Sequence, residues 1–318
     1  MDKKIEHTLI IPEDCGGLRL DAALAKLLPD FSRTQLQAWI TNGELTVNNQ
    51  VVKTRQTVWG GESIALSAFP KVQPVWEAQS IDLDVVFEDD ALLVINKPIG
   101  MVVHPAAGHA NSTLLNALLH HAPLLKSLPR AGILHRLDKD TSGLLVIAKT
   151  NAARIHLSRQ LRARRITRIY QAIVTGVLTG GGKVDQPIGR HPIHRKRMAV
   201  IETGKPAVTH YRLIEKYRAH TRVKIQLETG RTHQIRVHMA FIHHSLLGDP
   251  TYGGRLQLPK GATLPLIEQL RTFKHQALHA SELGLIHPVT EEAMTWQAPL
   301  PHDFRELVRV LAEDARSL

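Results

Sequence analysis

The sequence predicts an α+β protein with a largely antiparallel, mixed sheet, preceded by a small domain of helices and strands. From about residue 82, short β-rich runs are separated by turn signals, with helices among them but no strict alternation. Residues 18–67 form a separate pattern of two helices and a hairpin, and residues 70–80 contain two prolines without periodicity. A chain of 318 residues with 43% hydrophobic content is long enough for two domains. We expect them at 16–76 and 82–318.

The first domain begins with the run LRLDAALAKLL, which places Leu20 and Leu24 on one helical face. A second helix is expected to start at Ser32, with Gln35 in the capping-box position, and to end at Gly43. Short strands around a turn at Asn48 and Asn49 complete the pattern. They are expected at Leu45–Val47, Val51–Val52 and within WGGESIALS.

The second domain consists of short runs that are rich in β-branched and apolar residues. These runs are VVFED, ALLVINK, GLLVIAK, YQAIVTG, THYRLIE, TRVKIQLETG and HQIRVHM. Apolar periodicity predicts helices at 112–121, 151–164 and 302–316. The mixture favours a sheet with helices packed against it.

The charge of the chain is concentrated in one window. Of the net charge of +11, residues 151–200 hold +10, from eleven Lys and Arg against one Asp. Such clustering is typical of a surface that follows the phosphates of a nucleic acid, although a solvated charged face is the simpler alternative. A single cysteine, Cys15, fits a reducing cytoplasm. We find no signal peptide and no apolar run long enough for a membrane span, so a cytoplasmic protein is expected.

The segment HRLDKDTSG, residues 135–143, holds Asp138 and Asp140 just before the apolar run LLVIA. A loop held by a buried strand is a favoured place for catalytic groups. A metal site lacks the usual ligand spacings, and an aspartic protease needs a second Asp-Thr-Gly that is absent. The remaining interpretation is one catalytic carboxylate held ionised by an arginine and acting on RNA. For Asp140 we favour a structural role, capping backbone amides of the loop.

Seven motifs make the resemblance to a known family specific. In order they are INKPIGMVVHPAAG, GILHRLDKDTSGLLVIAKT, RIYQAIVTG, PIGRHPIHRKRMAV, GKPAVTHYRL, LETGRTHQIRVHMA and LLGDPTYGG. Together they resemble the RluA-type pseudouridine synthases over almost the whole chain. Residues 18–52 resemble an S4 RNA-binding domain. The resemblance implies a pseudouridine synthase fold and isomerisation of uridines in 23S ribosomal RNA or a large-subunit precursor, without cofactor or metal.

The resemblance also implies a role for particular residues. Asp138 corresponds to the catalytic aspartate, Tyr170 to the residue that stacks on the flipped base, and Arg236 to the partner of the aspartate. Ile235 and Val237 are expected to form the apolar wall of the base pocket. Residues expected to contact RNA are Arg33, Lys53 and Arg55 in the first domain, and Arg136, Arg162, Arg164, Arg165, Arg195, Lys196, Arg197 and Arg231 in the second.

Two other functions stay open from the sequence alone. One is a non-catalytic RNA-binding factor in ribosome assembly that keeps the fold, and the other is a synthase of the same family that acts on transfer RNA. Because the same fold serves several RNAs, the site residues do not specify the substrate. A monomer is expected, because no heptad run is evident.

Overall fold

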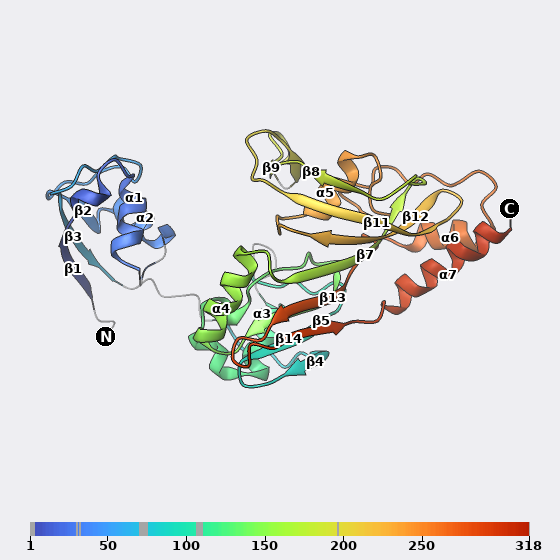
Figure 1. Ribbon diagram of the computed structural model, residues 1–318, viewed down its shortest axis with the longest axis horizontal. Coiled ribbons are helices and arrows are strands. Elements are labelled where there is room, and N and C mark those ends of the chain that lie inside the picture. Colours follow the sequence, from blue (N-terminus) through green and yellow to red (C-terminus); the bar gives the residue numbers. More distant parts are fainter. Residues whose placement is uncertain are drawn as a thin grey trace. The chain divides into compact units, whose positions relative to one another are not determined.

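The computed structural model describes residues 4–29, 31, 33–69, 76–105, 111–195 and 197–317. The chain divides into two compact units, Met1–Val75 and Trp76–Leu318 (Figure 1). Ser32, expected to start a helix, and Lys196, expected to contact RNA, lie outside the described residues. Within the described ranges, no helix is both long enough and apolar enough to cross a membrane.

The first unit packs two helices on a three-stranded antiparallel sheet of order β1-β3-β2. Its elements are β1 (Ile5–Ile10), a 3-10 turn (Glu13–Cys15), α1 (Leu20–Leu27), α2 (Arg33–Asn42), β2 (Leu45–Val47) and β3 (Ser63–Ala68). Leu24, Leu36 and Trp39 from the two helices are fully buried against the sheet. The first strand precedes residue 16, where we expected this domain to begin.

The expected strand at Val51–Val52 is wrong, because no strand forms there. Asn48 and Asn49 both adopt positive φ, at 48° and 64°, and reverse the chain within two residues. The returning segment pairs only once, between Val47 and Gln50. The hairpin turn was therefore predicted in the right place, but its second arm does not continue as a strand.

The second unit is built on a nine-stranded sheet, most of whose pairs are antiparallel (Figure 1). The order is β4-β5-β6-β13-β7-β12-β11-β8, with β14 beside β13, and among the strand pairs of the described residues only β6 and β13 run parallel. The strands are β4 (Val85–Glu88), β5 (Leu92–Lys97), β6 (Ser142–Ala148), β7 (Thr167–Thr175), β8 (Gly182–Asp185), β11 (Val208–Lys216), β12 (His220–Leu227), β13 (Leu278–Ile286) and β14 (Ala293–Gln297). The hairpin of β9 (Ile188–Arg190) and β10 (Met198–Val200) is separate.

Strands β5 and β6 are buried on both faces, which explains their almost continuous apolar runs. Alternate side chains face different cores: Leu93 and Leu145 belong to one, and Leu92 and Leu144 to the other. The first core also holds helix α3 (Leu114–His121), and the second holds α4 (Asn151–Arg162). These strands and their neighbour β13 therefore form a rigid centre for the loops at their ends.

Three predicted helices form close to their predicted ranges, as α3, α4 and α7 (His302–Arg316). Helix α6 (Leu264–Thr272) was not predicted, and it packs beside α7 in a third core. The prediction of a β-rich run at HQIRVHM is wrong, because Gln234–Phe241 forms helix α5. Its short alternation of apolar and polar residues resembles a strand, yet six of the eight residues of this helix are buried.

One glycine allows β6 to lie against β13. Gly143 has φ of 112°, and a Cβ atom there would come within 2.2 Å of the carbonyl oxygen of Ala280. Only glycine fits this close backbone approach. The parallel pairing of Ser142 and Gly143 with His279 and Ala280 fixes the start of β6. The turn that carries Asp138 and Asp140 lies immediately before it.

Candidate active site

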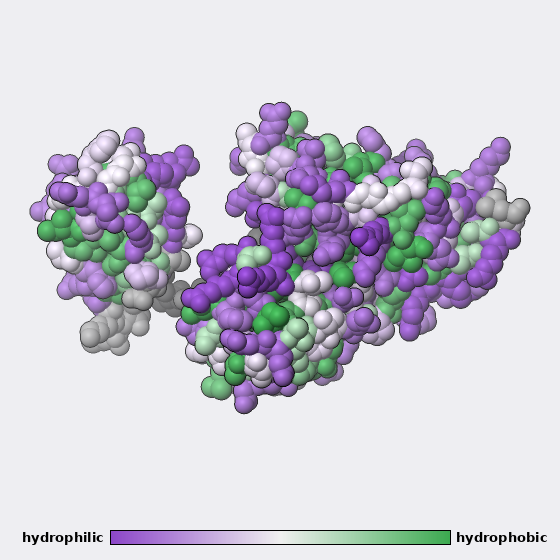
Figure 2. Space-filling model, in the orientation of Figure 1, coloured by the Kyte–Doolittle hydropathy of each residue, from purple (hydrophilic) through white to green (hydrophobic). Residues whose placement is uncertain are grey.

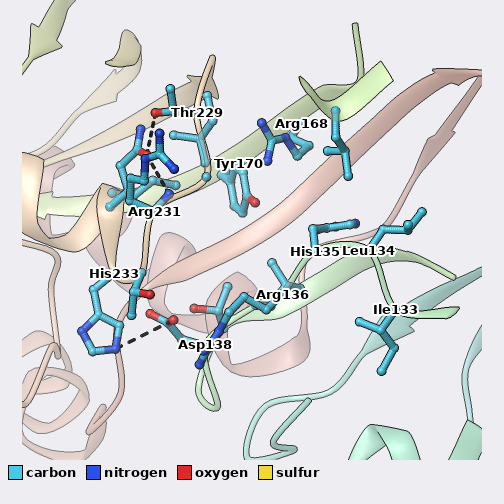
Figure 3. A pocket seen from close by; sticks show the side chains of 18 of the residues that line it. Ile133, Leu134, His135, Arg136, Asp138, Arg168, Tyr170, Thr229, Arg231 and His233 are labelled. Carbon is cyan, nitrogen blue, oxygen red and sulfur yellow. Dashed lines mark hydrogen bonds and ion pairs between the residues drawn. The ribbon is translucent and has the colours of Figure 1, made fainter. Parts of the chain in front are cut away.

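One cleft of the second unit contains the residues to which the sequence analysis assigned chemistry. It has a volume of about 860 Å³, and Asp138, Tyr170 and Arg236 all line it. Asp138 comes from the turn before β6, Tyr170 from β7 and Arg236 from α5. Figure 3 shows Asp138 and Tyr170 on opposite sides of one space, with Arg136 beside Asp138. A flat ring could enter between them.

Arg236 joins two carboxylates. Its Nη1 atom donates to Oδ2 of Asp138 at 3.0 Å, while Nε and Nη2 donate to the two oxygens of Asp249 at 2.7 and 2.9 Å. The side chain of Asp249 is fully buried, whereas that of Asp138 is 16% exposed at the cleft. A two-pronged pair with Asp249 fixes the guanidinium plane, which leaves one N–H directed at Asp138.

The electrostatics of this group favour full charge on Arg236 and Asp249. Burial opposes the charge of Arg236, but its hydrogen bonds to Asp249 and the charges of both carboxylates raise its pKa above the ordinary value. Burial likewise opposes the charge of Asp249, but Arg236 and the backbone amides of Tyr252 and Thr251 hold its pKa below the ordinary value. The buried Arg236 thus keeps Asp249 as a permanent partner and has one further N–H that it donates to Asp138.

His233 lies on the other side of Asp138. Its Nε2 atom is 3.9 Å from Oδ1 of Asp138, and its Nδ1 atom is 2.9 Å from the hydroxyl of Tyr252. That hydroxyl accepts the backbone N–H of Met198, so its own proton is directed at Nδ1 of His233. Burial lowers the pKa of His233, against the charge of Asp138. A neutral ring in this arrangement carries its proton on Nε2, facing Asp138.

A buried lysine ties the Asp138 turn to β5. Lys97 is fully buried, and its Nζ atom donates to the carbonyl oxygens of Pro98, Met101 and Lys139 at 2.7 to 3.0 Å. Burial lowers the pKa of Lys97 to about 8, and the charges of Asp140 and Asp138 oppose this. Three hydrogen bonds from a protonated amine hold the turn in place.

The expected capping role of Asp140 is wrong. Within the described ranges, no backbone amide donates to its side chain. The N–H of Thr141 closes the turn instead, by donating to the carbonyl of Asp138. Lys97 also holds the turn, by donating to the carbonyl of Lys139. Asp140 contributes its charge near Lys97 rather than a hydrogen bond.

Tyr170 presents a free hydroxyl to the cleft. The residue is 5% exposed, and within the described part of the chain its hydroxyl has no hydrogen-bond partner. Burial raises its pKa, so the phenol stays neutral at physiological pH. Such a ring can stack on a base, and its hydroxyl can donate or accept one hydrogen bond.

Comparison with known proteins identifies the family. The profile of the family described as RNA pseudouridylate synthase matches residues 91–241, and that of the S4 domain matches residues 18–64. The chain is 52% identical over 314 residues to ribosomal large subunit pseudouridine synthase D of Pseudomonas aeruginosa, covering 99% of this chain and 98% of the relative. The protein of the same name from Pasteurella multocida is 56% identical over 299 residues, covering 94% of this chain and 92% of the relative. The chain belongs to the RNA pseudouridylate synthase family.

Solved structures agree with this assignment. The structure described as human RNA pseudouridylate synthase domain containing 4 is 26% identical, with a TM-score of 0.57, and the match covers 72% of this chain and 92% of that one. A second human structure, described as RNA pseudouridylate synthase domain containing 1, matches with a TM-score of 0.55 at 26% identity, over 70% and 86% of the two chains. The α+β fold expected of a pseudouridine synthase is therefore confirmed.

The basic residues of the second unit that we expected to contact RNA divide into two groups in this synthase. Those that line the cleft are Arg136, Arg162, Arg164 and Arg231. Arg165, Arg195 and Arg197 are exposed outside it, the last two at the tip of the β9–β10 hairpin. Hydrophilic side chains cover α4 and the adjoining surface (Figure 2). The basic window is thus a broad surface rather than the lining of one cleft.

In the S4 domain of the synthase, Arg33 is held by an internal carboxylate. Its guanidinium donates to both oxygens of the fully buried Asp21, which Arg19 and Gln37 also contact. The side chain of Arg33 is still 48% exposed. Lys53 and Arg55 are exposed, and within the described part of this domain their side chains form no hydrogen bond or ion pair. Arg33 therefore has a structural partner that we did not predict.

The placement of Val237 in the base pocket is wrong. Ile235 lines the cleft, but Val237 packs against Ile188 and Ala207 in a separate cluster. On a strand, residues two apart share a face, whereas on a helix they point about 200° apart. Because Gln234–Phe241 is helical, Ile235 faces the cleft and Val237 does not.

Sequence reasoning missed Asp249, Tyr252 and Lys97 as parts of the site. Asp249 acts on Asp138 through Arg236, Tyr252 acts through His233, and Lys97 bonds the carbonyl of Lys139. A local signal existed for Asp249 in the motif DPTYGG, because an aspartate followed by proline commonly caps the following turn. The N–H groups of Thr251 and Tyr252 do donate to Asp249 at 2.8 and 3.0 Å. Within the described part of the synthase, no cluster of three or more potential metal ligands occurs.

Proposed function

We propose that this protein converts specific uridines of large-subunit ribosomal RNA to pseudouridine, with Asp138 as the catalytic carboxylate. The observation that carries the proposal is the cleft in which Asp138, held by Arg236, faces Tyr170 across a space for a base. The names of the relatives in Pseudomonas and Pasteurella support the choice of ribosomal RNA. The family shared with them supports the reaction.

The first step is extrusion of the uridine. A base buried by stacking in folded RNA is out of reach of any carboxylate, so it must leave the helix. Arg136 is exposed at the cleft beside Asp138, where its side chain can fill the space that the base vacates. The extruded uracil then stacks on Tyr170, and Ile235 supplies part of the apolar wall.

The second step rearranges the nucleoside. Asp138 acts on the nucleoside as a nucleophile or as a base, and the bond between N1 of uracil and C1′ of ribose breaks. The freed uracil turns, C5 bonds to C1′, and the proton on C5 is lost while N1 gains one. Atoms and electrons balance without a redox partner or cofactor. A cleft that excludes water strengthens the interaction of Asp138 with Arg236 and protects the intermediate.

The exposed arginines and lysines serve binding rather than chemistry. In this proposal Arg162, Arg164 and Arg231 at the cleft, and the exposed cations of the S4 domain, contact RNA phosphates. Affinity for RNA then falls steeply with salt, because each neutralised phosphate releases counterions. A cytoplasmic monomer completes the proposal. Its location follows from the substrate, and gel filtration with light scattering tests its oligomeric state.

Release of tritium from C5-labelled uridine tests the proposed substrate. The RNAs are transcripts of large-subunit ribosomal RNA, small-subunit ribosomal RNA and transfer RNA, assayed at equal concentration. We expect release from the large-subunit transcript alone. Release only from transfer RNA would contradict the proposed target, and binding of the large-subunit RNA without release from any substrate would favour an assembly factor.

A further inference from the structure

One arginine of the cleft differs from all the others. Arg168 lies on β7, two residues before Tyr170, and only 7% of it is exposed. Its Nε atom is shielded from solvent and has no hydrogen-bond partner. Within the described part of the chain, no carboxylate forms an ion pair with Arg168, although it lines the cleft (Figure 3).

This arrangement is costly for a folded protein. A buried guanidinium loses its hydration, and folded proteins normally offset that loss with a carboxylate and with hydrogen bonds. Arg236, buried to a similar degree in the same cleft, has two carboxylate partners. An arginine that lacks such partners at a functional cleft indicates that its partner arrives with the substrate.

The loop after β12, residues 228–233, holds one acidic side chain, and that side chain is already engaged. Glu228 pairs with Arg164 through Oε2 and with His210 through Oε1. The positive charge of Arg168 instead changes the pKa values of neighbouring groups. It adds to burial in lowering the pKa of His135 to about 3, and it opposes the rise that burial causes in the pKa of Tyr170.

The loop after β12 leaves room for the guanidinium of Arg168 at Gly230. A Cβ atom on Gly230 would come within 2.8 Å of Nη1 of Arg168. Any side chain at residue 230 therefore displaces the guanidinium from its place. The absence of a side chain there keeps the end of Arg168 at the cleft wall beside Tyr170.

We propose that Arg168 is a substrate-binding residue whose guanidinium takes up an anionic oxygen of the extruded uridine nucleotide. The proposal rests on the proposed function. The nucleotide offers two sources of such an oxygen. One is its phosphodiester, which is charged throughout the reaction. The other is the uracil ring, whose O2 and O4 share the electron pair that remains on uracil when the bond from N1 to C1′ breaks.

The variants Arg168→Met, Arg168→Lys and Gly230→Ala test the proposal against a matched control. The control is Arg222→Met, because Arg222 is on the neighbouring strand β12 and contacts Gln171 on the opposite face of the sheet. For each protein we would measure RNA affinity over a series of KCl concentrations and the single-turnover rate of tritium release. Thermal melting shows which variants fold.

If the phosphodiester is the partner, Arg168→Met weakens binding roughly 10- to 100-fold, as for loss of a hydrogen bond between charged groups. The slope of log affinity against log salt also falls by about 0.7 to 0.9, the contribution of one phosphate contact. Arg168→Lys keeps the slope, and Gly230→Ala shifts affinity in the same direction as Arg168→Met. If the uracil ring is the partner, the affinity and slope are unchanged and the single-turnover rate falls.

Equal affinity and rate in Arg168→Met and Arg222→Met would overturn the proposal. If Arg168→Met does not fold, the measurements on Arg168→Lys and Gly230→Ala test the proposal. Normal RNA affinity and a normal rate in Gly230→Ala would then overturn the proposal. Failure of the Arg168 proposal can be told apart from failure of the proposed function. If the unaltered protein releases tritium, the proposed function stands whatever the role of Arg168.

Discussion

Replacing Asp249 with asparagine removes one charge from the group that positions Asp138. The fully buried carboxylate accepts two hydrogen bonds from Arg236 and two from backbone amides. In the Asp249→Asn variant, an amide nitrogen of the new side chain faces the guanidinium. Arg236 then loses a hydrogen bond and keeps Asp138 as its one carboxylate partner. Breaking a buried ion pair from one side costs about 3–5 kcal/mol. For a domain of this size, that lowers the melting temperature by roughly 10 °C.

The same change should slow the reaction without weakening RNA binding. Arg236 is then free to turn, and Asp138 loses the N–H that orients it at 3.0 Å. Misplacement of a catalytic group by about 1 Å can cost a factor of about 100 in rate. We therefore expect a decrease of about that size in the single-turnover rate, measured by tritium release at a temperature where the variant is folded.

Asp314→Asn is the matched control. Asp314 is also buried, accepts from Arg218 at 2.7 Å, and caps the backbone N–H of Thr263, but it lies on helix α7 away from the cleft. It should destabilise the protein by a similar amount and leave the rate unchanged. If both variants slowed the reaction equally, or if Asp249→Asn melted lower but reacted at the normal rate, the positioning role of Asp249 would be wrong.

Two further predictions follow from the geometry. Tyr170→Ala should weaken binding of the extruded nucleotide by about 1–3 kcal/mol through loss of stacking, whereas Tyr170→Phe should retain that binding; equal affinities in a filter-binding assay would contradict stacking. His220 is 4% exposed, and burial lowers its pKa to about 4. The unfolded chain, with a pKa near 6.5, then binds more protons between these values, so stability should fall by about 3 kcal/mol as the pH drops from 7 to 4. His220→Gln should be less sensitive to pH in urea unfolding, and an unchanged pH dependence would show that other groups cause the effect.

The sequence predicted elements best where the pattern was long. Residues 302–316 show a sustained apolar period, and helix α7 has those bounds. Residues 234–241 form only two turns, and the alternation of Ile235, Val237 and Met239 with polar residues indicated a strand. The tertiary contacts of a short buried segment decided its structure, which sequence periodicity cannot show. The wrong placement of Val237 followed directly from the wrong prediction of a strand.

The candidate site was predictable only as far as local motifs reached. Asp138, Tyr170 and Arg236 each lie in a motif of their own, and the structure places them around one cleft. Asp249 and Lys97 were missed because their roles depend on contacts with Arg236 and with the carbonyl of Lys139, which come from distant segments. Arg168 was visible as one of six arginines in residues 154–168, but only burial distinguishes it from the exposed ones.

The central claim is that Asp138, and not its neighbour Asp140, performs the chemistry. The most direct measurement is tritium release from C5-labelled large-subunit RNA by Asp138→Asn and Asp140→Asn, with RNA binding measured in parallel. Both replacements keep the shape of the side chain and remove its charge. We expect no release by Asp138→Asn, near-normal release by Asp140→Asn, and normal RNA binding by both. Release by Asp138→Asn at the normal rate would contradict the account.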